Sequence, residues 1–453
     1  MPPSRPPGNT RHRSRRGAQP CAPTYQQTRR NRMKQKTFTF KLIKAPRLID
    51  DTGGRVLEQA AVLIEGDAIR AVGTEEAVVP PEGAQVEELS YKDATILPGL
   101  VDCHVHMNGI GDGRAGDELT TLPDEVLTLQ SAKNARAHLY SGVTTLRDCG
   151  GKNRTTFMLR QAVGMGITPA PRMLLAGRPM AIIGGHLSYF GIAATGEVEC
   201  RAAVRQLVKE GADFVKITAT GGSTRTSIRT RPSFNPDEMK AIVDEAHKFG
   251  RHVVAHCVSS QGMVNALDAG VDTIVHAIHQ EADGAFKYRP EIADRIARQG
   301  VFVNPTFSVV RKHMRNLEAK VEDGTITPAQ QESLDGLNVS YEAMVNGFQK
   351  MRKAGVTMVC GSDSAWLDSP MGNFQAELVA EVDAGMKPME AIVSATRDSA
   401  RSCQVDDKVG TLAKGKQADI LVVKGNPARD VNDLYNIQDV FLAGQRIDRG
   451  NYV

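Results

Sequence analysis

Residues 98–106 read PGLVDCHVH, an apolar run that ends on two histidines separated by one residue. Side chains two positions apart in a β-strand point to the same face, so His104 and His106 can reach one metal ion together. The same alternation turns Cys103 and Val105 to the opposite face. Two strand histidines also occur without a metal, so the rest of the chain has to decide between a ligand pair and ordinary strand residues.

Further apolar runs follow this stretch, and segments with helical character separate them. The predicted strands are Ile96–Met107, Thr144–Asp148, Met173–Ala176, Phe214–Thr218, His252–His256, Thr273–His276, Phe302–Asn304 and Thr357–Ser362. One intervening helix is predicted over Pro236–Phe249, after the cap Asn235 and before Gly250. Alternating strands and helices favour a parallel sheet, and eight units in roughly 270 residues match an α/β fold of the (β/α)8 TIM-barrel type.

The two ends of the chain carry a different pattern of short strands and tight turns. Ala61–Glu65 and Ala68–Val72 flank the turn Gly66-Asp67 and predict a hairpin, and Ala418–Val423 and Val440–Leu442 repeat this pattern near the other end. We expect these segments to pair into one small β-sandwich. The predicted organisation is a disordered basic arm at 1–36, the first part of the sandwich at 37–96, the TIM barrel at 97–405 and the second part of the sandwich at 406–453.

Charge is distributed unevenly along the chain. Residues 1–36 contain ten Lys and Arg residues and no acidic residue, which leaves 46 basic against 52 acidic residues in the remainder of the 453-residue chain. The body is therefore acidic, which excludes a nucleic-acid-binding domain. Three interpretations of the basic arm stay open: a disordered tail, an Arg-rich transit peptide, or translated upstream sequence with Met33 as the natural start.

Composition also bears on the cellular compartment. No apolar run approaches the about 20 residues that a membrane span requires, and the N-terminus lacks the apolar centre of a secretory signal. The seven cysteines are scattered and never form a Cys-x-x-Cys pair, which argues against a disulfide framework. We therefore expect a soluble cytoplasmic protein that acts on a small molecule, forms homo-oligomers and has no membrane or nucleic-acid partner.

Other potential metal ligands stand where predicted strands end. His256 closes HVVAH, His276 closes TIVH, and Asp363 follows MVCGS. TIM-barrel active sites lie at the carboxyl ends of the strands, and imidazole and carboxylate ligands suit zinc or a similar transition metal. Lys216 lies inside the apolar strand DFVKI, where burial penalises a charged amine unless it is paired or chemically altered. The alternative is a lysine whose amine extends to the barrel mouth.

Taken together, these motifs resemble the amidohydrolase superfamily of metal-dependent hydrolases. The resemblance rests on PGLVDCHVH, GVTTLRD at 142–148, FVKI, VVAHC, IVHA, CGSDS, GTL at 410–412 and GKQADI at 415–420. It implies that His104 and His106 hold one divalent metal ion, and that His256 and His276 hold a second. It also implies that Lys216, carboxylated by carbon dioxide, bridges the two ions, expected to be zinc. Asp363 would bind the first ion and move protons.

Within that superfamily the chain is similar to the branch with Xaa-Pro and Arg/Lys carboxypeptidase-type dipeptidases, imidazolonepropionase-like proteins and ochratoxin hydrolases. The similarity rests on Gly-Gly-His at 184–186 and Ala-Thr-Gly-Gly at 219–222. Phenylurea hydrolases are similar too, so a urea substrate stays open. Many relatives have Glu-His-Gly at the sixth strand, whereas this chain has VHAIH at 275–279. We favour His276 over His279 as the ligand because His276 directly closes the apolar run.

Several residues near these motifs are candidates for substrate contact. His186 follows two glycines and is a candidate to hydrogen-bond the scissile carbonyl oxygen or the flank of the substrate, the alternative being a structural role in its loop. Tyr189 follows shortly after it. Arg225, Arg229 and Arg231 lie in the loop 223–233, after the fourth strand, where an arginine can bind a substrate carboxylate through two hydrogen bonds. A charge-rich loop is also often simply solvated. His279 is a further substrate-binding candidate if it is not a ligand.

The predicted activity is hydrolysis of an amide-type C–N bond by a metal-bridged hydroxide, with Asp363 passing the proton of the water to the leaving nitrogen. A urea or carbamate hydrolase is an alternative. A deaminase of the same fold is another, but such enzymes typically use one metal and lack the strand lysine, so Lys216 counts against it. A barrel that binds metal without catalysis is a third alternative, but such proteins usually lose ligands, and here every expected ligand is present.

Overall fold

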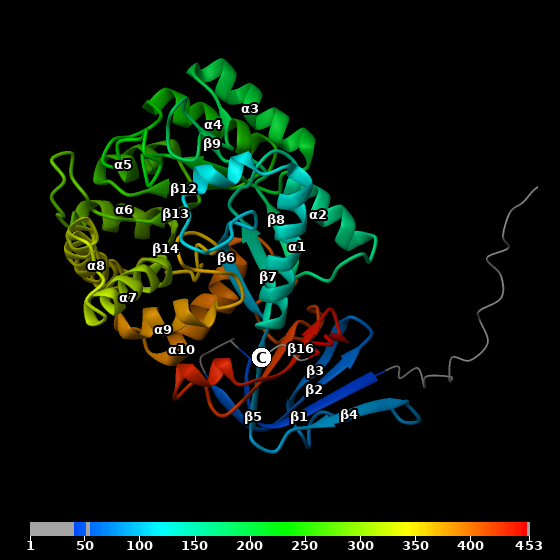
Figure 1. Ribbon diagram of the computed structural model, residues 1–453. Helices are drawn as coiled ribbons and strands as arrows, with labels where there is room; N and C mark the ends of the chain where they lie inside the picture. Colours follow the sequence, from blue (N-terminus) through cyan, green and yellow to red (C-terminus); the bar gives the residue numbers. More distant parts are fainter. Residues whose placement is uncertain (1–39, 51–54, 451–453) are drawn as a thin grey trace, which may run out of the picture. The chain divides into compact units, whose positions relative to one another are not determined.

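The computed structural model describes residues 40–50 and 55–450, so the predicted basic arm lies outside the described residues. Strands from both ends of the described chain form one mixed sheet, drawn in blue and red in Figure 1. Its order is β17-β16-β15-β5-β1-β2-β3, and β4 also pairs with β1. The strands are β1 Phe40–Ile49, β2 Val56–Glu65, β3 Ala68–Thr74, β4 Val86–Ser90, β5 Ala94–Pro98, β15 Ile420–Lys424, β16 Ile437–Leu442 and β17 Gln445–Arg446.

The two chain ends meet at the antiparallel pair of β5 and β15, which runs from Ala94 opposite Lys424 to Pro98 opposite Ile420. The predicted hairpin is confirmed by the antiparallel pairing of β2 with β3 around Gly66, whose φ of 62° a glycine adopts without steric penalty. Apolar side chains from both ends, including Ile43, Ile96 and Ile420, share one buried cluster. The sequence expectation that the end segments pair is therefore correct at the level of the sheet.

Parallel strands make up the remainder of the β-structure. One sheet has the order β6-β7-β8 and a second has the order β10-β9-β11-β12-β13-β14. The first predicted strand, Ile96–Met107, is divided at Gly99 between β5 of the mixed sheet and β6. With that correction, seven of the eight predicted strands are present among the parallel strands. Their bounds are β6 Leu100–Val105, β7 Val143–Asp148, β8 Arg172–Leu175, β9 Met180–Ala181, β10 Ile192–Ala193, β11 Val215–Thr218, β12 Val253–Cys257, β13 Thr273–His276 and β14 Phe302–Asn304.

The eighth predicted strand, Thr357–Ser362, is not a regular strand, but its backbone lies between β14 and β6. Val359 N donates to Val303 O at 2.8 Å, and Cys103 N donates to Cys360 O at 3.1 Å. At the other junction between the parallel sheets, Asp213 N donates to Leu175 O at 2.9 Å. Hydrogen bonds therefore connect the two parallel sheets at both of their junctions.

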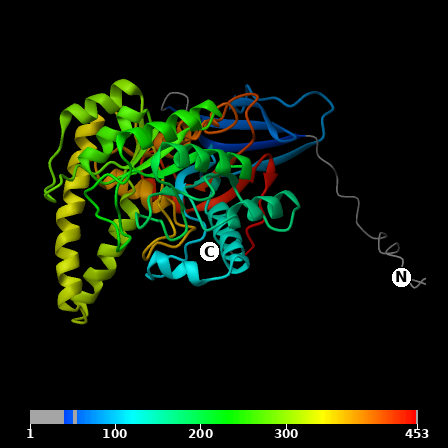
Figure 2. The ribbon, with the colours of Figure 1, turned by 90° about the horizontal axis from the view of Figure 1, so that it is seen from above.

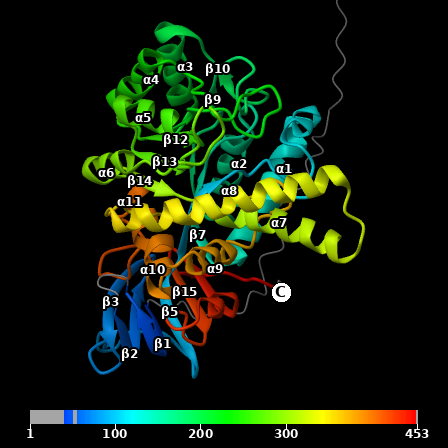
Figure 3. The ribbon, with the colours of Figure 1, turned by 90° about the vertical axis from the view of Figure 1, so that its left-hand side faces the viewer.

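Helices follow most of the parallel strands and pack against them (Figures 1 and 3). The predicted helix after Asn235 is confirmed: the Asn235 side chain accepts from Glu238 N, and the Glu238 side chain accepts from Asn235 N, a capping box. Helices α7 and α8 form a hairpin, drawn in yellow-green and yellow in Figure 2. The helices are α1 Asp124–Tyr140, α2 Thr155–Gly164, α3 Gly196–Glu210, α4 Pro236–Lys248, α5 Ser260–Ala269, α6 Pro290–Gln299, α7 Phe307–Glu322, α8 Pro328–Lys353, α9 Gln375–Asp383, α10 Pro388–Val393 and α11 Ser399–Ser402.

Short helical turns complete the chain: the 3-10 turns Gly116–Thr121 and Val431–Tyr435, and the π-helical turn Ser394–Asp398. In the ranges that the structure describes, no helix combines the length and the apolar character needed to cross a membrane.

Candidate active site

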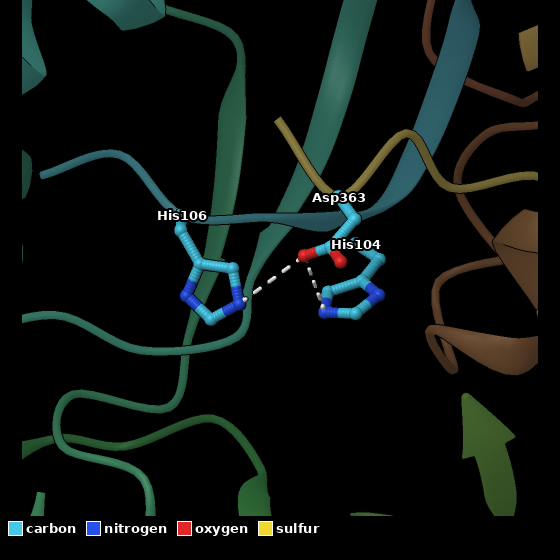
Figure 4. Close-up of side chains that lie close together, drawn as sticks. All are labelled: His104, His106 and Asp363. Carbon is cyan, nitrogen blue, oxygen red and sulfur yellow. Dashed lines mark ion pairs between the residues drawn. The ribbon is translucent and has the colours of Figure 1, made fainter. Parts of the chain in front are cut away.

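His104 near the end of β6, His106 just after it and Asp363 after the eighth predicted strand come together at the carboxyl ends of the strands (Figure 4). His104 Nε2 lies 3.4 Å and His106 Nε2 lies 3.5 Å from Asp363 Oδ1. Both histidines are almost completely buried. Two imidazole nitrogens and one carboxylate oxygen at such distances are a donor set that suits a divalent transition metal.

The other predicted ligands lie beside this group. The imidazoles of His256 and His276 have ring centroids 4.6 Å apart, and the His104 and His276 centroids are 5.7 Å apart. Lys216 Nζ lies 3.1 Å from His104 Nε2. All six predicted ligands line a single cavity of about 930 Å³. The structure therefore brings together side chains from β6, β11, β12, β13 and the segment after residue 362.

Each of the four histidines is hydrogen-bonded through one ring nitrogen. The pairs are His104 Nδ1 with Asn304 Oδ1 at 3.1 Å, His106 Nδ1 with Gly150 O at 2.8 Å, His256 Nε2 with Gly221 O at 3.1 Å, and His276 Nδ1 with Thr306 Oγ1 at 2.7 Å. The partners of His104, His106 and His256 are carbonyl oxygens, which only accept, so in these three imidazoles the bonded nitrogen carries the proton and the other nitrogen presents a lone pair. The Thr306 hydroxyl can donate or accept, so this contact holds the His276 ring without by itself deciding which nitrogen carries the proton. Three of the four histidines therefore have the tautomer, as well as the residue type, that suits a metal site.

The pKa values of the four histidines also favour a metal site. Burial, reinforced by the charge of Lys216, lowers the pKa of His106 to about 3. Burial likewise holds the pKa values of His104, His256 and His276 well below the ordinary histidine value. These imidazoles are therefore neutral near pH 7, which is the form that binds a metal ion.

Lys216 is the unusual member of the group. Its side chain is buried, and within the described ranges no carboxylate lies at ion-pair distance from its amine. A buried ammonium without an anionic partner is unfavourable because it loses its hydration. Packing alone therefore does not explain why a lysine occupies position 216.

A buried aspartate that the sequence analysis did not single out holds the segment before Asp363 in place. Asp102 Oδ2 accepts from Ser362 Oγ at 2.6 Å and from His138 Nε2 at 2.9 Å, and Asp102 Oδ1 accepts from Ser362 N at 3.0 Å. Asp363 itself has a φ of 54°, a left-handed conformation that is uncommon for a residue other than glycine. Burial raises the pKa of Asp363 to about 7, against the lowering effect of Lys216.

His186 lies beside the second pair of histidines. Its ring centroid is 4.4 Å from that of His256, its Nδ1 lies 3.0 Å from Thr224 Oγ1, and burial lowers its pKa to about 3. A Cβ atom on Gly222 would lie only 2.6 Å from the His186 ring, which explains a glycine at this position. The structure therefore places His186 in the cavity as a neutral imidazole.

Aromatic side chains form one wall of the cavity. Trp366, the only tryptophan of the chain, has its ring centroid 5.0 Å from that of His106 and stacks on Phe190 at 6.0 Å with an interplanar angle of 7°. Tyr189, a candidate for substrate contact from the sequence, lines the cavity next to them, and burial raises its pKa. Trp366 was missed by the sequence analysis, although its position three residues after Asp363 was a usable signal.

The arginine loop contributes to the same cavity. Arg225 and Arg229 line it, whereas Arg231 is not among its lining residues. Burial lowers the pKa of Arg229, and its charge contributes to the low pKa values of His186 and His276. Neither Arg225 nor Arg229 has a hydrogen-bond or ion-pair partner within the described residues, so both guanidinium groups remain available to a ligand.

His279 lies outside this cavity lining. Its Nδ1 accepts from Arg289 N at 3.2 Å, its ring centroid is 4.9 Å from that of Tyr288, and burial lowers its pKa to about 4. Of the two histidines in VHAIH, it is His276 that faces the other predicted ligands. The backbone turns at this point, because both His276 and Ala277 have positive φ angles of 69° and 50°.

Comparison with known proteins adds to these observations. Ochratoxinase from Aspergillus niger is 27% identical to this chain over 409 residues, which cover 83% of this chain and 80% of ochratoxinase. The crystal structure of a Xaa-Pro dipeptidase with bound methionine in the active site has a TM-score of 0.78 and 28% identity, and the match covers 90% of this chain and 100% of the dipeptidase. Phenylurea hydrolase B, with a TM-score of 0.76 and 22% identity over 90% of this chain and 97% of its own, is similar in fold.

The pattern of the Amidohydrolase family matches residues 95–447, a range that contains the whole cavity lining. On this match and on its hydrolase relatives, the chain belongs to the Amidohydrolase family and is a hydrolytic enzyme.

Proposed function

We propose that this protein is a metal-dependent hydrolase that cleaves the amide C–N bond of a small molecule with a carboxylate group. The observation that carries the proposal is the set of four neutral, oriented histidines that surround Asp363 and Lys216 in one cavity. In this proposal residues 97–405 close into an eight-stranded TIM barrel, for which the hydrogen bonds at both sheet junctions are the support. In the same proposal, the described residues of 37–96 and 406–453 form the β-sandwich.

In the proposed metal centre, His104, His106 and Asp363 would hold one ion, and His256 and His276 would hold the other. Lys216, carboxylated on Nζ by carbon dioxide with release of its protons, would supply oxygen ligands to both. Carboxylation replaces a buried cation that has no anionic partner with an anion that can bind metal ions, which explains a lysine at this position. When bound, two divalent ions, expected to be zinc, lower the pKa of a coordinated water and polarise the scissile carbonyl.

The residues of the chain then have distinct tasks. Asp363 accepts the proton of the attacking water and delivers it to the leaving nitrogen, so that the amine departs neutral. His186 binds the carbonyl oxygen through Nε2–H, because the Thr224 hydroxyl hydrogen-bonds its other nitrogen and because its low pKa keeps it neutral. The aromatic wall of Tyr189 and Trp366 excludes water from the reacting bond.

The charge of the cavity favours an amide over a neutral urea. Arg225 and Arg229 face the cavity without partners in the described ranges, and an arginine binds a carboxylate through two parallel hydrogen bonds. One of the similar proteins is named a Xaa-Pro dipeptidase, and a dipeptide is an amide with a carboxylate group, which supports the amide assignment. The likeness to phenylurea hydrolase B concerns the fold and gives a urea no comparable support.

The proposal is tested by protein purified with zinc and bicarbonate. Elemental analysis should find about two metal ions per subunit, and a panel of dipeptides, N-acyl amino acids and arylureas should show turnover among the carboxylate-bearing amides. Lys216→Ala should lower the metal content and abolish turnover. If the wild type contains about one metal ion per subunit and Lys216→Ala contains the same amount, the carbamate bridge is excluded. If the protein hydrolyses arylureas and none of the amides, the amide assignment is excluded.

A further inference from the structure

The loop after β14 holds His276 through a single hydroxyl group. Thr306 Oγ1 lies 2.7 Å from His276 Nδ1, and Thr306 is buried. Thr306 has a φ of 56°, a left-handed conformation that is a genuine outlier for a β-branched residue. Such a conformation persists only where the surrounding structure enforces it.

Thr306 is also the N-cap residue of α7, yet its side chain does not cap the helix. A threonine at this position normally accepts a hydrogen bond from one of the first backbone N–H groups, and those groups otherwise lack partners. Here the hydroxyl is directed to His276 instead. The N-terminus of α7 must therefore be satisfied by another group.

Glu377, in the first turn of α9, supplies that group. Its Oε1 accepts from Phe307 N at 2.8 Å and its Oε2 accepts from Ser308 N at 2.6 Å. The side chain is fully buried, and a carboxylate at a helix N-terminus is favoured by both the free N–H groups and the helix dipole. Glu377 thus performs the capping that Thr306 does not.

We propose that Glu377 is a positioning residue for the second metal ion: by capping α7 in place of Thr306, it releases the Thr306 hydroxyl to orient His276. This inference rests on the two-metal site proposed above. If Nδ1 of His276 donates to Thr306, the lone pair of Nε2 is directed to the metal. Without the Glu377 carboxylate, the Thr306 hydroxyl returns to the helix N-terminus and His276 loses its fixed tautomer.

The chain offers a matched control on the same helix. Glu381 lies four residues after Glu377, is equally buried, and accepts from Ser394 Oγ at 2.8 Å rather than from α7. Glu377→Gln and Glu381→Gln therefore replace one buried carboxyl group each on α9, but only the first changes a contact with the N-terminus of α7. At Thr306, Thr306→Val removes the hydroxyl and keeps the shape, whereas Thr306→Ser keeps the hydroxyl.

The experiment measures metal content and Co²⁺ affinity of the whole protein. It is run at about pH 8.5, because burial raises the pKa of Glu377 to about 7 and the carboxylate must be ionised. In Glu377→Gln and Thr306→Val, we expect the affinity for one of two ions to fall by about 10–100-fold. Thr306→Ser and Glu381→Gln should bind both ions as the wild type does.

A second measurement does not depend on metal loading. In metal-free protein labelled with ¹⁵N-histidine, the His276 signal, assigned by its loss in His276→Gln, should report a proton on Nδ1 in the wild type. It should report a mixture of tautomers in Glu377→Gln and in Thr306→Val. Because Thr306→Val and Thr306→Ser leave the capping by Glu377 intact, this pair tests whether the Thr306 hydroxyl orients His276 even if Glu377→Gln does not fold, and an unchanged His276 tautomer in Thr306→Val would overturn the inference.

Several results would overturn the inference. Unchanged affinity for both ions in Glu377→Gln or in Thr306→Val would do so, as would an equal loss in Glu381→Gln. If the wild type binds only one ion, the proposed two-metal function is contradicted, whereas the inference about Glu377 is not. The His276 tautomer in metal-free Glu377→Gln then shows whether Glu377 acts on His276.

Discussion

The side-chain oxygen of Asn304 lies 3.1 Å from Nδ1 of His104, on the opposite side of the imidazole from the nitrogen that faces Asp363. The amide nitrogen of Asn304 donates to the carbonyl oxygens of Val359 at 3.3 Å and Gly361 at 3.0 Å. These two bonds settle the orientation of the amide, because the end that faces two carbonyl oxygens must be the NH₂ group. His104 therefore carries its proton on Nδ1.

Replacing Asn304 should weaken metal binding. Asn304→Ala removes the acceptor that fixes the His104 tautomer, so metal affinity should fall by about 10–100-fold while the ligands themselves remain. Competition with a chromophoric chelator measures this. Asn265→Ala, which removes a buried asparagine on α5 outside the cavity lining, is the control and should keep wild-type affinity. Equal losses in the two variants would point to general destabilisation.

Asp363→Asn should separate metal binding from proton transfer. The amide keeps an oxygen ligand but has no basic lone pair for the water proton, so with saturating metal kcat should fall by about 10²–10⁴-fold. Metal content and thermal unfolding of the same sample show whether it is loaded and folded. A loaded variant with nearly normal turnover would remove Asp363 from proton transfer, leaving His186 as the nearest candidate in the cavity.

Arg229→Gln should change specificity more than catalysis. A charged hydrogen bond to a carboxylate contributes about 1.5–3 kcal/mol, so KM for a carboxylate-bearing amide should rise by about 10–100-fold. The same amide with its carboxylate blocked as a carboxamide should show little change. Arg231→Gln, in the same loop but outside the cavity lining, should have the smaller effect. If both variants raise KM for the two substrates alike, the loop acts through its general charge.

Glu381 should make the protein less stable as the pH rises. Burial, reinforced by the charge of Glu377, raises its pKa from 4.5 to about 8. The folded state thus holds this proton more tightly than the unfolded chain, and the stability gained is fully present below pH 4.5 and lost as pH rises to about 8. The free energy of unfolding should fall by up to roughly 1.4 kcal/mol per pH unit relative to Glu381→Gln.

Denaturant titrations of wild type and Glu381→Gln at about pH 5 and about pH 8 measure that difference. The two proteins should differ in the slope of stability against pH, whatever their absolute stabilities. Parallel slopes would mean that the Glu381 carboxyl titrates in the folded protein as it does in the unfolded chain.

The positions of the predicted ligands followed from the sequence because each one closes an apolar strand. His104, His106, His256 and His276 stand at the carboxyl ends of β6, β12 and β13, where a parallel sheet gathers side chains. The strict alternation expected along β6 was wrong, since its register shifts between Asp102 and Val105. Cys103 packs with Val254 and Val359, whereas Val105 belongs to another cluster. A β-bulge depends on the partner strand, so one strand's sequence does not reveal it.

The residues that orient the ligands were not predicted, and the reason is their distance along the chain. Asn304 acts on a histidine 200 positions away, and Asp102 reaches Ser362 across 260 positions. Neither has a local pattern that marks its role, because both are single polar residues beside apolar runs. Their function exists only once the strands are assembled, whereas a strand end is visible in the sequence itself.

The pairing of β5 with β15 has a consequence for the newly made chain. Pro98 lies opposite Ile420, so β5 emerges from the ribosome roughly 320 residues before its neighbour. At roughly 5–20 residues per second, β5 waits on the order of tens of seconds with an open hydrogen-bonding edge. An exposed edge strand is a template for pairing with other chains. A message truncated before the codon for Ile420 should therefore yield a nascent protein that aggregates, even though every residue of the cavity lining has already been translated.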